Sequence, residues 1–131
     1  MAFWSPHVEV ITLFVDDVER AKTFYGDVFE LETVYEDANS AVVKFDNLII
    51  NLLDVRQGHE LIGPATVGSG PSGARVLFTI PVDDVDAACE ELAKRGVTLV
   101  NGPMDRPWGI RTASFMDPDG HLWEFAGDLR D

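Results

Sequence analysis

The sequence has few basic residues and a single cysteine, and both features restrict what the protein can be. Ten Lys and Arg residues stand against 23 Asp and Glu residues, so the formal net charge is −13. Nucleic-acid binding needs a basic face that neutralises phosphates, so this composition argues against nucleic acid as a partner. The lone Cys89 cannot form an intrachain disulfide, and its place in a helical pattern predicts a buried structural thiol.

Long hydrophobic runs are also missing. No apolar stretch approaches the roughly 20 residues that cross a bilayer, and the first residues do not form a basic segment followed by an apolar one. We therefore expect no membrane partner and a cytoplasmic location. The 131 residues, 46% hydrophobic and 25% charged, are enough to bury a core as one domain.

A short motif is repeated half a chain apart. Val15-Asp16-Asp17-Val18 recurs as Val82-Asp83-Asp84-Val85. A stretch rich in β-branched and aromatic residues precedes each copy, as expected of a strand, and an amphipathic helix pattern follows it. The paired aspartates of each copy predict a helix N-cap. We interpret the repeat as an internal duplication.

Each half reads as a strand, a helix and three further strands. Helices are expected over 18–29 and 85–95, and Gly96 is expected to end the second one. The strands after the helices are expected over 31–36, 40–45, 48–54, 97–101, 110–116 and 121–126. The domain then consists of module one, 7–54, a linker, 55–73, and module two, 74–127. The Gly- and Pro-rich linker either covers a ligand as a lid or only joins the modules.

These motifs resemble the vicinal oxygen chelate superfamily, which includes glyoxalase I, extradiol dioxygenases, fosfomycin-modifying enzymes and bleomycin-resistance binding proteins. The resemblance rests on segment 14–25 near the start and on segments 107–111 and 115–125, which contain Pro-Trp-Gly-Ile-Arg and Asp-Pro-Asp-Gly. It implies an α+β fold in which two βαβββ modules form a curled mixed sheet around a cavity. It also implies a homodimer, which in some members exchanges modules.

The resemblance indicates where a metal would bind. Metal-dependent members carry a ligand on the first and the last strand of each module, which corresponds here to Val10 and Asn51 and to Leu77 and Glu124. Val10 and Leu77 have no lone pair to offer, and a divalent ion usually needs three or four protein donors. We therefore expect no metal cofactor, with Glu124 as a weak candidate ligand; the alternative is a divalent metal such as Zn, Fe, Ni or Mn. The three histidines form no ligand pair and are expected at the surface or in turns: His7, His59 and His121.

Strand alternation predicts which side chains face the helices and which face the cavity. The helix-facing set is expected to be Ile11, Leu13, Val15, Phe78, Ile80 and Val82. The cavity-facing set is expected to be Val10, Thr12, Phe14, Leu77 and Thr79, joined by Asn51 and Glu124. An apolar pocket with a few polar groups is typical of a small-molecule site, although these side chains could instead simply pack together.

Two further features bear on the ligand. Glu124 could act as a general base, bind a cationic ligand, or pair with Arg111 from the neighbouring strand, because an unpaired buried carboxylate is costly. In bleomycin-resistance-like members a segment similar to Pro107–Arg111 lies near the drug site, where an aromatic ring stacks on flat ligands and acidic residues attract the positive drug. Otherwise Trp108 and Gly109 only pack the loop. The predicted ligand-binding residues are Thr12, Phe14, Asn51, Thr79, Trp108, Arg111 and Glu124, and no catalytic residue is assigned.

The leading interpretation is a metal-free small-molecule binding protein of the glyoxalase/bleomycin-resistance type. It would be a homodimer with a planar or cationic ligand in the sheet cavity near the dimer interface. The alternatives are a divalent-metal-dependent lyase or dioxygenase that uses Glu124, and a non-catalytic dimerisation module. We favour binding over catalysis, because Val10 and Leu77 stand where metal-dependent members carry ligands, and no nucleophile triad or phosphate-binding loop is visible.

Overall fold

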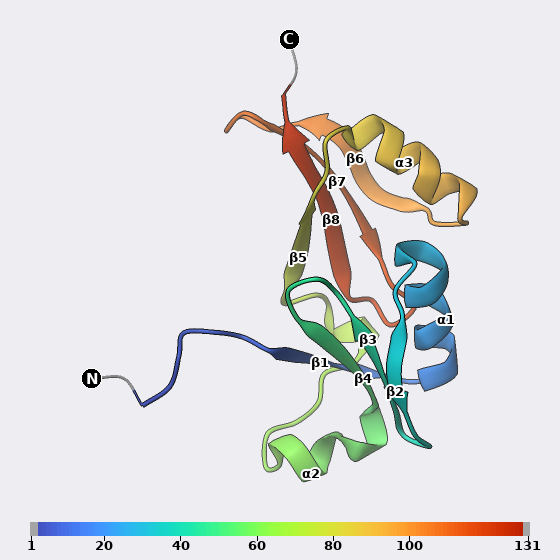
Figure 1. The fold of residues 1–131 in the computed structure, drawn as a ribbon, viewed down its shortest axis with the longest axis vertical. Coiled ribbons are helices and arrows are strands. Elements are labelled where there is room, and N and C mark those ends of the chain that lie inside the picture. The colour runs from blue at the N-terminus through green and yellow to red at the C-terminus, as the bar shows by residue number, and fades with distance from the viewer. Residues whose placement is uncertain (1–2, 130–131) are drawn as a thin grey trace. The chain divides into compact units, whose positions relative to one another are not determined.

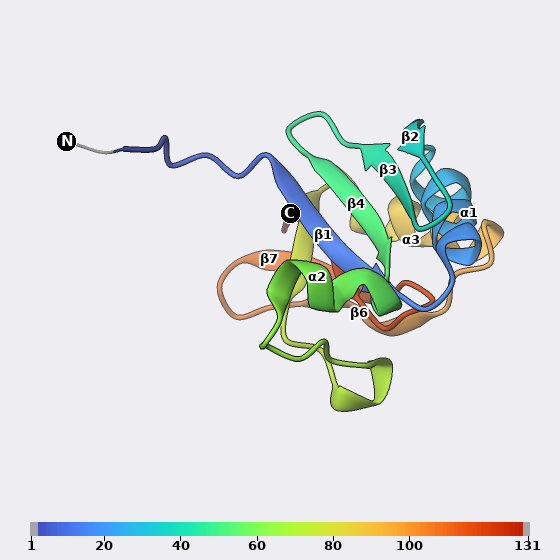
Figure 2. The same ribbon diagram turned by 90° about the horizontal axis from the view of Figure 1, so that it is seen from below.

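A computed structural model describes residues 3–129, and this part of the chain divides into two compact units between Val67 and Gly68 (Figure 1). The first unit contains strand β1 (Val10–Val15), helix α1 (Val18–Phe29) and strands β2 (Thr33–Glu36), β3 (Ser40–Lys44) and β4 (Ile49–Asp54). Its sheet has the order β1-β4-β3-β2, with β1 parallel to β4. A 3-10 turn (Val55–Gln57) and the short helix α2 (Gly58–Ile62) follow β4 (Figure 2).

The second unit has the same order of main elements. After a 3-10 turn (Gly70–Ser72) come strand β5 (Leu77–Pro81), helix α3 (Val85–Lys94) and strands β6 (Leu99–Asp105), β7 (Ile110–Met116) and β8 (Leu122–Asp128). The sheet order is β5-β8-β7-β6, with β5 parallel to β8. The predicted α+β fold class of two βαβββ modules is therefore confirmed. The expected linker is not bare coil, since it holds α2 and two 3-10 turns.

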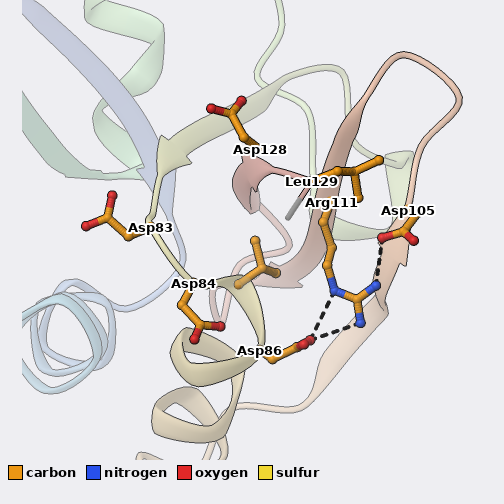
Figure 3. Close-up of a pocket in the computed structure, with 8 residues that line it drawn as sticks. Asp83, Asp84, Asp86, Asp105, Arg111, Asp128 and Leu129 are labelled. Carbon is orange, nitrogen blue, oxygen red and sulfur yellow. Dashed lines mark hydrogen bonds and ion pairs between the residues drawn. The ribbon is translucent and has the colours of Figure 1, made fainter. Parts of the chain in front are cut away.

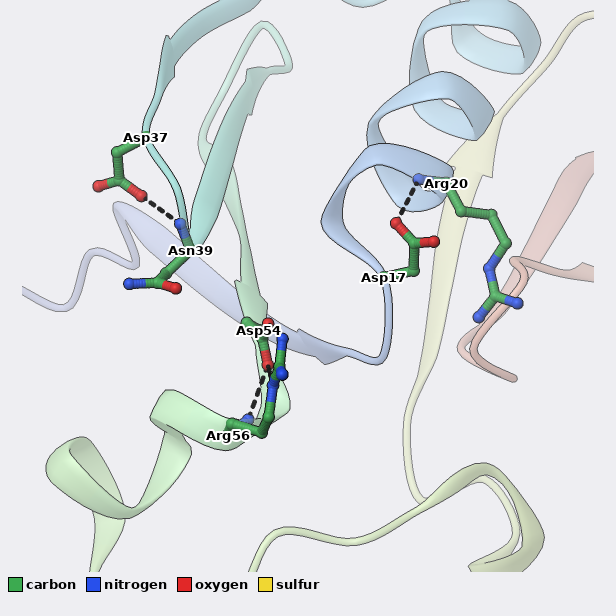
Figure 4. Close-up of polar contacts among 6 residues, drawn as sticks. All are labelled: Asp17, Arg20, Asp37, Asn39, Asp54 and Arg56. Atoms are coloured by element: carbon green, nitrogen blue, oxygen red, sulfur yellow. Dashed lines mark hydrogen bonds and ion pairs between the residues drawn. The ribbon is translucent and has the colours of Figure 1, made fainter.

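Each long helix begins where the repeated aspartates predict. Asp17 has extended backbone, and its carboxylate accepts a hydrogen bond from the amide of Arg20 at 3.1 Å (Figure 4). Asp84 does the same for the amide of Ala87 at 3.0 Å. The second aspartate of each pair thus satisfies an amide that the first helical turn leaves without a partner.

Each helix covers one face of its own sheet. Helix α1 packs on β3 and β4, and α3 packs on β6, β7 and β8. In the first unit the buried face includes Leu13 and Val15, as alternation predicts, together with Ala21, Tyr25, Val28, Ala41, Val43, Ile50 and Leu52. In the second unit it includes Val85, Leu92, Ala113, Phe115, Trp123 and Phe125. Val82, which follows β5, packs against a cluster of Val85, Cys89 and Ala113. The ring centroid of Phe78 in β5 lies 4.9 Å from that of the buried Trp123, so the predicted helix-facing side of β5 is also correct.

Cys89 is buried in this cluster as a free thiol. Burial raises the pKa of the Cys89 thiol, and the carboxylate of Asp86 raises it further. A thiol with a raised pKa forms less of the nucleophilic thiolate. Its packing role agrees with the sequence prediction.

The main error in the predicted elements is the end of the first strand after α3. The sequence predicts this strand over 97–101, ending before Gly102 and Pro103. The structure continues β6 to Asp105 across an irregularity between Asn101 and Met104 in the pairing with β7. A bulge of this kind accommodates residues that a regular ladder rejects.

No helix within residues 3–129 is long and apolar enough to cross a membrane.

Candidate functional site

The predicted cavity residues lie on the sheet faces that the helices leave uncovered, and they form one polar pair in each unit. In the first unit Thr12 of β1 is in register with Asn51 of β4. The Asn51 amide nitrogen Nδ2 donates to Thr12 Oγ1 at 3.4 Å. In the second unit Thr79 of β5 is in register with Glu124 of β8, and Thr79 Oγ1 donates to Glu124 Oε1 at 2.8 Å. The two pairs occupy equivalent positions in equivalent sheets.

Apolar side chains surround these pairs. Val10 precedes Thr12 by two residues on the same face and is 45% exposed. Leu77 has the same position relative to Thr79 and is 47% exposed. Met116, on β7 beside Leu122, is 48% exposed. Exposed apolar surface around a few hydrogen-bonding groups is characteristic of a face that contacts another molecule.

Phe14, a further predicted ligand-binding residue, is partly covered by the segment after β4. A Cβ atom added to Gly58 of α2 would lie 3.3 Å from Phe14 Cε1 and 2.5 Å from Val67 Cγ2. Gly58 is buried, so α2 approaches the Phe14 ring closely because residue 58 has no side chain. The linker therefore contacts the open face of the first sheet at the Phe14 end of β1.

The expected pairing of Glu124 with Arg111 is wrong. Nε and Nη2 of Arg111 donate to Asp86 Oδ1 at 3.1 and 3.0 Å, and Nη1 donates to Asp105 Oδ1 at 2.8 Å (Figure 3). These carboxylates raise the pKa of Arg111. Arg111 shares its face of β7 with the buried Ala113 and Phe115, which is the helix side, whereas Glu124 lies on the opposite face.

Trp108 is likewise not assembled with the polar pairs. It lies in the turn between β6 and β7, and its side chain is 68% exposed. The structure thus brings together Thr12 with Asn51 and Thr79 with Glu124, while Trp108 and Arg111 lie elsewhere in the second unit. Applying alternation to β7 as well as to β1 and β5 would have placed Arg111 on the helix side.

A pocket that sequence reasoning missed lies at the start of α3 in the second unit. It has a volume of about 260 Å³ and is lined by Asp83, Asp84, Val85, Asp86, Asp105, Arg111, Asp128 and Leu129 (Figure 3). Three of its carboxylates make contacts that stabilise the fold. Asp84 caps α3, and Asp86 and Asp105 form ion pairs with Arg111. These contacts tie α3 to β6 and β7. The repeated Val-Asp-Asp-Val motif, continued by Asp86, was the available sign of this acidic end.

The donor set does not fit the metal ion that metal-dependent relatives would hold. The first-strand positions are the hydrocarbons Val10 and Leu77, and the last-strand groups of Asn51 and Glu124 are hydrogen bonded to threonines. Over residues 3–129 no group of three or more His, Cys, Asp or Glu side chains is arranged to hold a metal ion. A stable divalent site needs more donors than these positions provide.

Comparison with known proteins identifies the family to which this chain is similar. The model of the glyoxalase/bleomycin resistance protein/dioxygenase superfamily matches residues 6–125. The uncharacterized protein YraH of Bacillus subtilis is 32% identical over 118 residues, which cover 87% of this chain and 92% of YraH. The metallothiol transferase FosB of Lysinibacillus sphaericus is 26% identical over 121 residues, which cover 89% of this chain and 79% of FosB.

Solved structures agree with this assignment. A glyoxalase/bleomycin resistance protein/dioxygenase from Nocardioides superposes with a TM-score of 0.86 at 25% identity, covering 98% of this chain and 87% of the other. TnmS3, an antibiotic-binding protein from Streptomyces sp. CB03234, superposes with a TM-score of 0.71 at 29% identity, covering 98% of this chain and all of TnmS3. The chain belongs to the glyoxalase/bleomycin resistance protein/dioxygenase superfamily.

Proposed function

We propose that this protein binds a small organic molecule on the open face of a sheet, without a metal ion. The observation that carries the proposal is the placement of the Thr12–Asn51 and Thr79–Glu124 pairs beside the exposed apolar side chains of Val10, Leu77 and Met116. Directional hydrogen-bonding groups in apolar surroundings orient a ligand while the apolar area supplies affinity. The likeness to an antibiotic-binding protein supports binding rather than catalysis.

The same apolar exposure supports a homodimer. Val10 and Leu77 expose nearly half of their hydrocarbon side chains on the sheet faces, where a contact would remove them from water. We therefore place the ligand near the interface of two copies. A cytoplasmic location is consistent with the buried free thiol of Cys89, since reducing compartments preserve such thiols.

The second candidate is a metal-dependent enzyme that uses Glu124, and the resemblance to the metallothiol transferase FosB favours it. The two functions differ in metal content. In native mass spectrometry of protein purified without chelator, we expect a dimer mass with substoichiometric metal. One Zn, Fe, Ni or Mn ion per chain that is lost on Glu124→Ala would contradict the metal-free proposal. A monomer mass would contradict the dimer.

Ligand binding should depend on the polar pairs and not on Arg111. In a thermal-shift screen of planar aromatic compounds, a ligand at 100 times its Kd adds about 2.7 kcal/mol of stability, which raises the Tm by several degrees. We expect Thr79→Val to weaken the best hit about tenfold, because it removes a hydroxyl from the polar pair of the second unit.

Arg111→Met is the matched control for this prediction. It removes a charged side chain from the opposite face of the second sheet and should leave the affinity of the same hit within about twofold. Equal losses of affinity in Arg111→Met and Thr79→Val would place the ligand elsewhere. A panel without any hit would favour a dimerisation module.

A further inference from the structure

The two polar pairs are equivalent in position but not in chemistry. In the first unit the row across the sheet runs from Thr12 through Asn51 to Val42, which is opposite Asn51 on β3. In the second unit the corresponding row runs from Thr79 through Glu124 to Ser114 on β7. Residues in register on neighbouring strands share a face of the sheet. Where the first row has the amide of Asn51 and the hydrocarbon of Val42, the second row has the carboxylate of Glu124 and the hydroxyl of Ser114.

The pair in the second unit presents acceptors and negative charge. The hydroxyl hydrogen of Thr79 is already donated to Glu124 Oε1, so the Thr79 oxygen offers only lone pairs outward. An ionised carboxylate has no hydrogen to donate, which leaves Glu124 Oε2 as a second acceptor. Over residues 3–129 no lysine or arginine forms an ion pair with Glu124. Arg111, which was expected to do so, is held by Asp86 and Asp105 on the other face.

The pair in the first unit is neutral and can both donate and accept. Asn51 uses one hydrogen of its amide nitrogen on Thr12 and keeps the other, together with its carbonyl oxygen. The Thr12 hydroxyl accepts that bond and keeps its own hydrogen. A group with a donor and an acceptor, such as an amide or a hydroxyl, matches this pair. A bare cation would offer no acceptor for the remaining donor hydrogens of Thr12 and Asn51.

We infer, on the basis of the proposed function, that the Thr79–Glu124 pair of the second unit binds a protonated amine, and that the Thr12–Asn51 pair of the first unit, as a separate site, suits a neutral group. A charge-assisted hydrogen bond from an ammonium group to Glu124 satisfies the carboxylate that the fold leaves without a cation. The net charge of −13 adds a long-range attraction for the same ligands. The two halves of the chain thus differ in specificity through residues 51 and 124.

A pair of probes that differ only in charge tests this inference. One is 2-naphthylmethylamine, which is protonated at pH 7, and the other is 2-naphthalenemethanol, which is neutral and of nearly the same shape. Their Kd values would be measured by calorimetry on the wild type, on Glu124→Gln and on Asn51→Asp. Both substitutions are isosteric and lie on partly exposed positions, and circular dichroism would check that each variant folds.

We expect the amine to bind the wild type about tenfold more tightly than the alcohol, because hydrogen bonds to charged groups are the stronger ones. Glu124→Gln should remove most of this preference while leaving the alcohol within about twofold, and Asn51→Asp should strengthen amine binding. The amine preference should also fall as NaCl is added.

Two outcomes would contradict the inference in different ways. If both probes bind with equal Kd values and Glu124→Gln leaves their ratio unchanged, the assignment of the amine to Glu124 is wrong although the protein does bind small aromatic molecules. If neither probe binds the wild type, the proposed function fails together with the inference.

Discussion

Replacing Gly102 with alanine should lower the free energy of unfolding by about 3 kcal/mol, because the alanine would adopt a strained backbone conformation and its Cβ would clash with β7. Gly102 has φ of +86°, a conformation that residues with a Cβ atom adopt at a cost of about 1–2 kcal/mol. The added Cβ would lie 2.5 Å from the carbonyl oxygen of Thr112 and 2.8 Å from Cα of Ala113. Both are backbone atoms of β7, so no side-chain rotation can relieve the contact.

The matched control is Gly96→Ala. Gly96 has nearly the same φ, +83°, but no atom within 4 Å of the position of an added Cβ. The free energy of unfolding of Gly96→Ala should therefore fall only by the cost of the backbone conformation, about 1 kcal/mol. Urea denaturation of both variants separates the two effects. Equal losses in Gly102→Ala and Gly96→Ala would show that the approach of β6 to β7 is looser than the structure describes.

The Gly102 contact also bears on the site. Asn101 precedes it in the irregular part of β6 and is in register with Ser114, which is in register with Glu124. A backbone shift at Gly102 would move this row of residues. We therefore expect Gly102→Ala to weaken ligand binding in the second unit as well as stability.

Replacing Asp54 with alanine should cost about 2 kcal/mol at pH 7, because hydrogen bonds to a charged group that is nearly buried are lost. Asp54 lies at the end of β4 and is only 5% exposed. Its Oδ1 accepts from the backbone amide and from Nε of Arg56, both at 2.9 Å (Figure 4). The side chain of Arg56, followed by its amide, lowers the pKa of Asp54 from 3.8 to about 2.

This prediction has a definite pH dependence. Because the pKa of Asp54 is lower in the folded than in the unfolded protein, the stabilisation is present above pH 3.8 and is lost as the pH falls towards 2. The difference in unfolding free energy between wild type and Asp54→Ala should therefore shrink between pH 5 and pH 3, by about half of its pH-dependent part. Urea denaturation at pH 7, 5 and 3 measures it.

Asp54→Asn serves as the control. The asparagine oxygen can still accept from the amide of Arg56, but it has no charge to pair with the guanidinium and no proton to gain in acid. It should be more stable than Asp54→Ala at pH 7. A gap between wild type and Asp54→Asn that stays constant from pH 7 to pH 3 would mean that Arg56 does not hold the carboxylate in its ionised form.

The elements were predictable because their signals are local. The amphipathic period and the capping aspartates predict α1 over the bounds that the structure has, and α3 to within one residue. The strand after α3 was predicted to end at Asn101, before Gly102 and Pro103. Pairing with β7 carries β6 past them, and that partner lies at a distance in sequence.

The candidate site divides in the same way. Alternation along β1 and β5 correctly put Thr12 and Thr79 opposite the helix faces, and equivalent last-strand positions brought Asn51 and Glu124 to them. Arg111 was misplaced because an ion pair was assigned by strand neighbourhood without checking the face. Its real partners, Asp86 of α3 and Asp105 of β6, are six or more positions away in the chain.

The amino-acid sequence by itself determined the superfamily, the two βαβββ units and the absence of metal donors at Val10 and Leu77, because motifs, periodicity and side-chain chemistry are all readable residue by residue. Only the tertiary structure decided that Glu124 is hydrogen bonded by Thr79 and that Arg111 is held by Asp86 and Asp105. The physical reason is that a charged side chain pairs with whichever partner the packing of helix and strands brings within about 3 Å, and strand register and face set that choice.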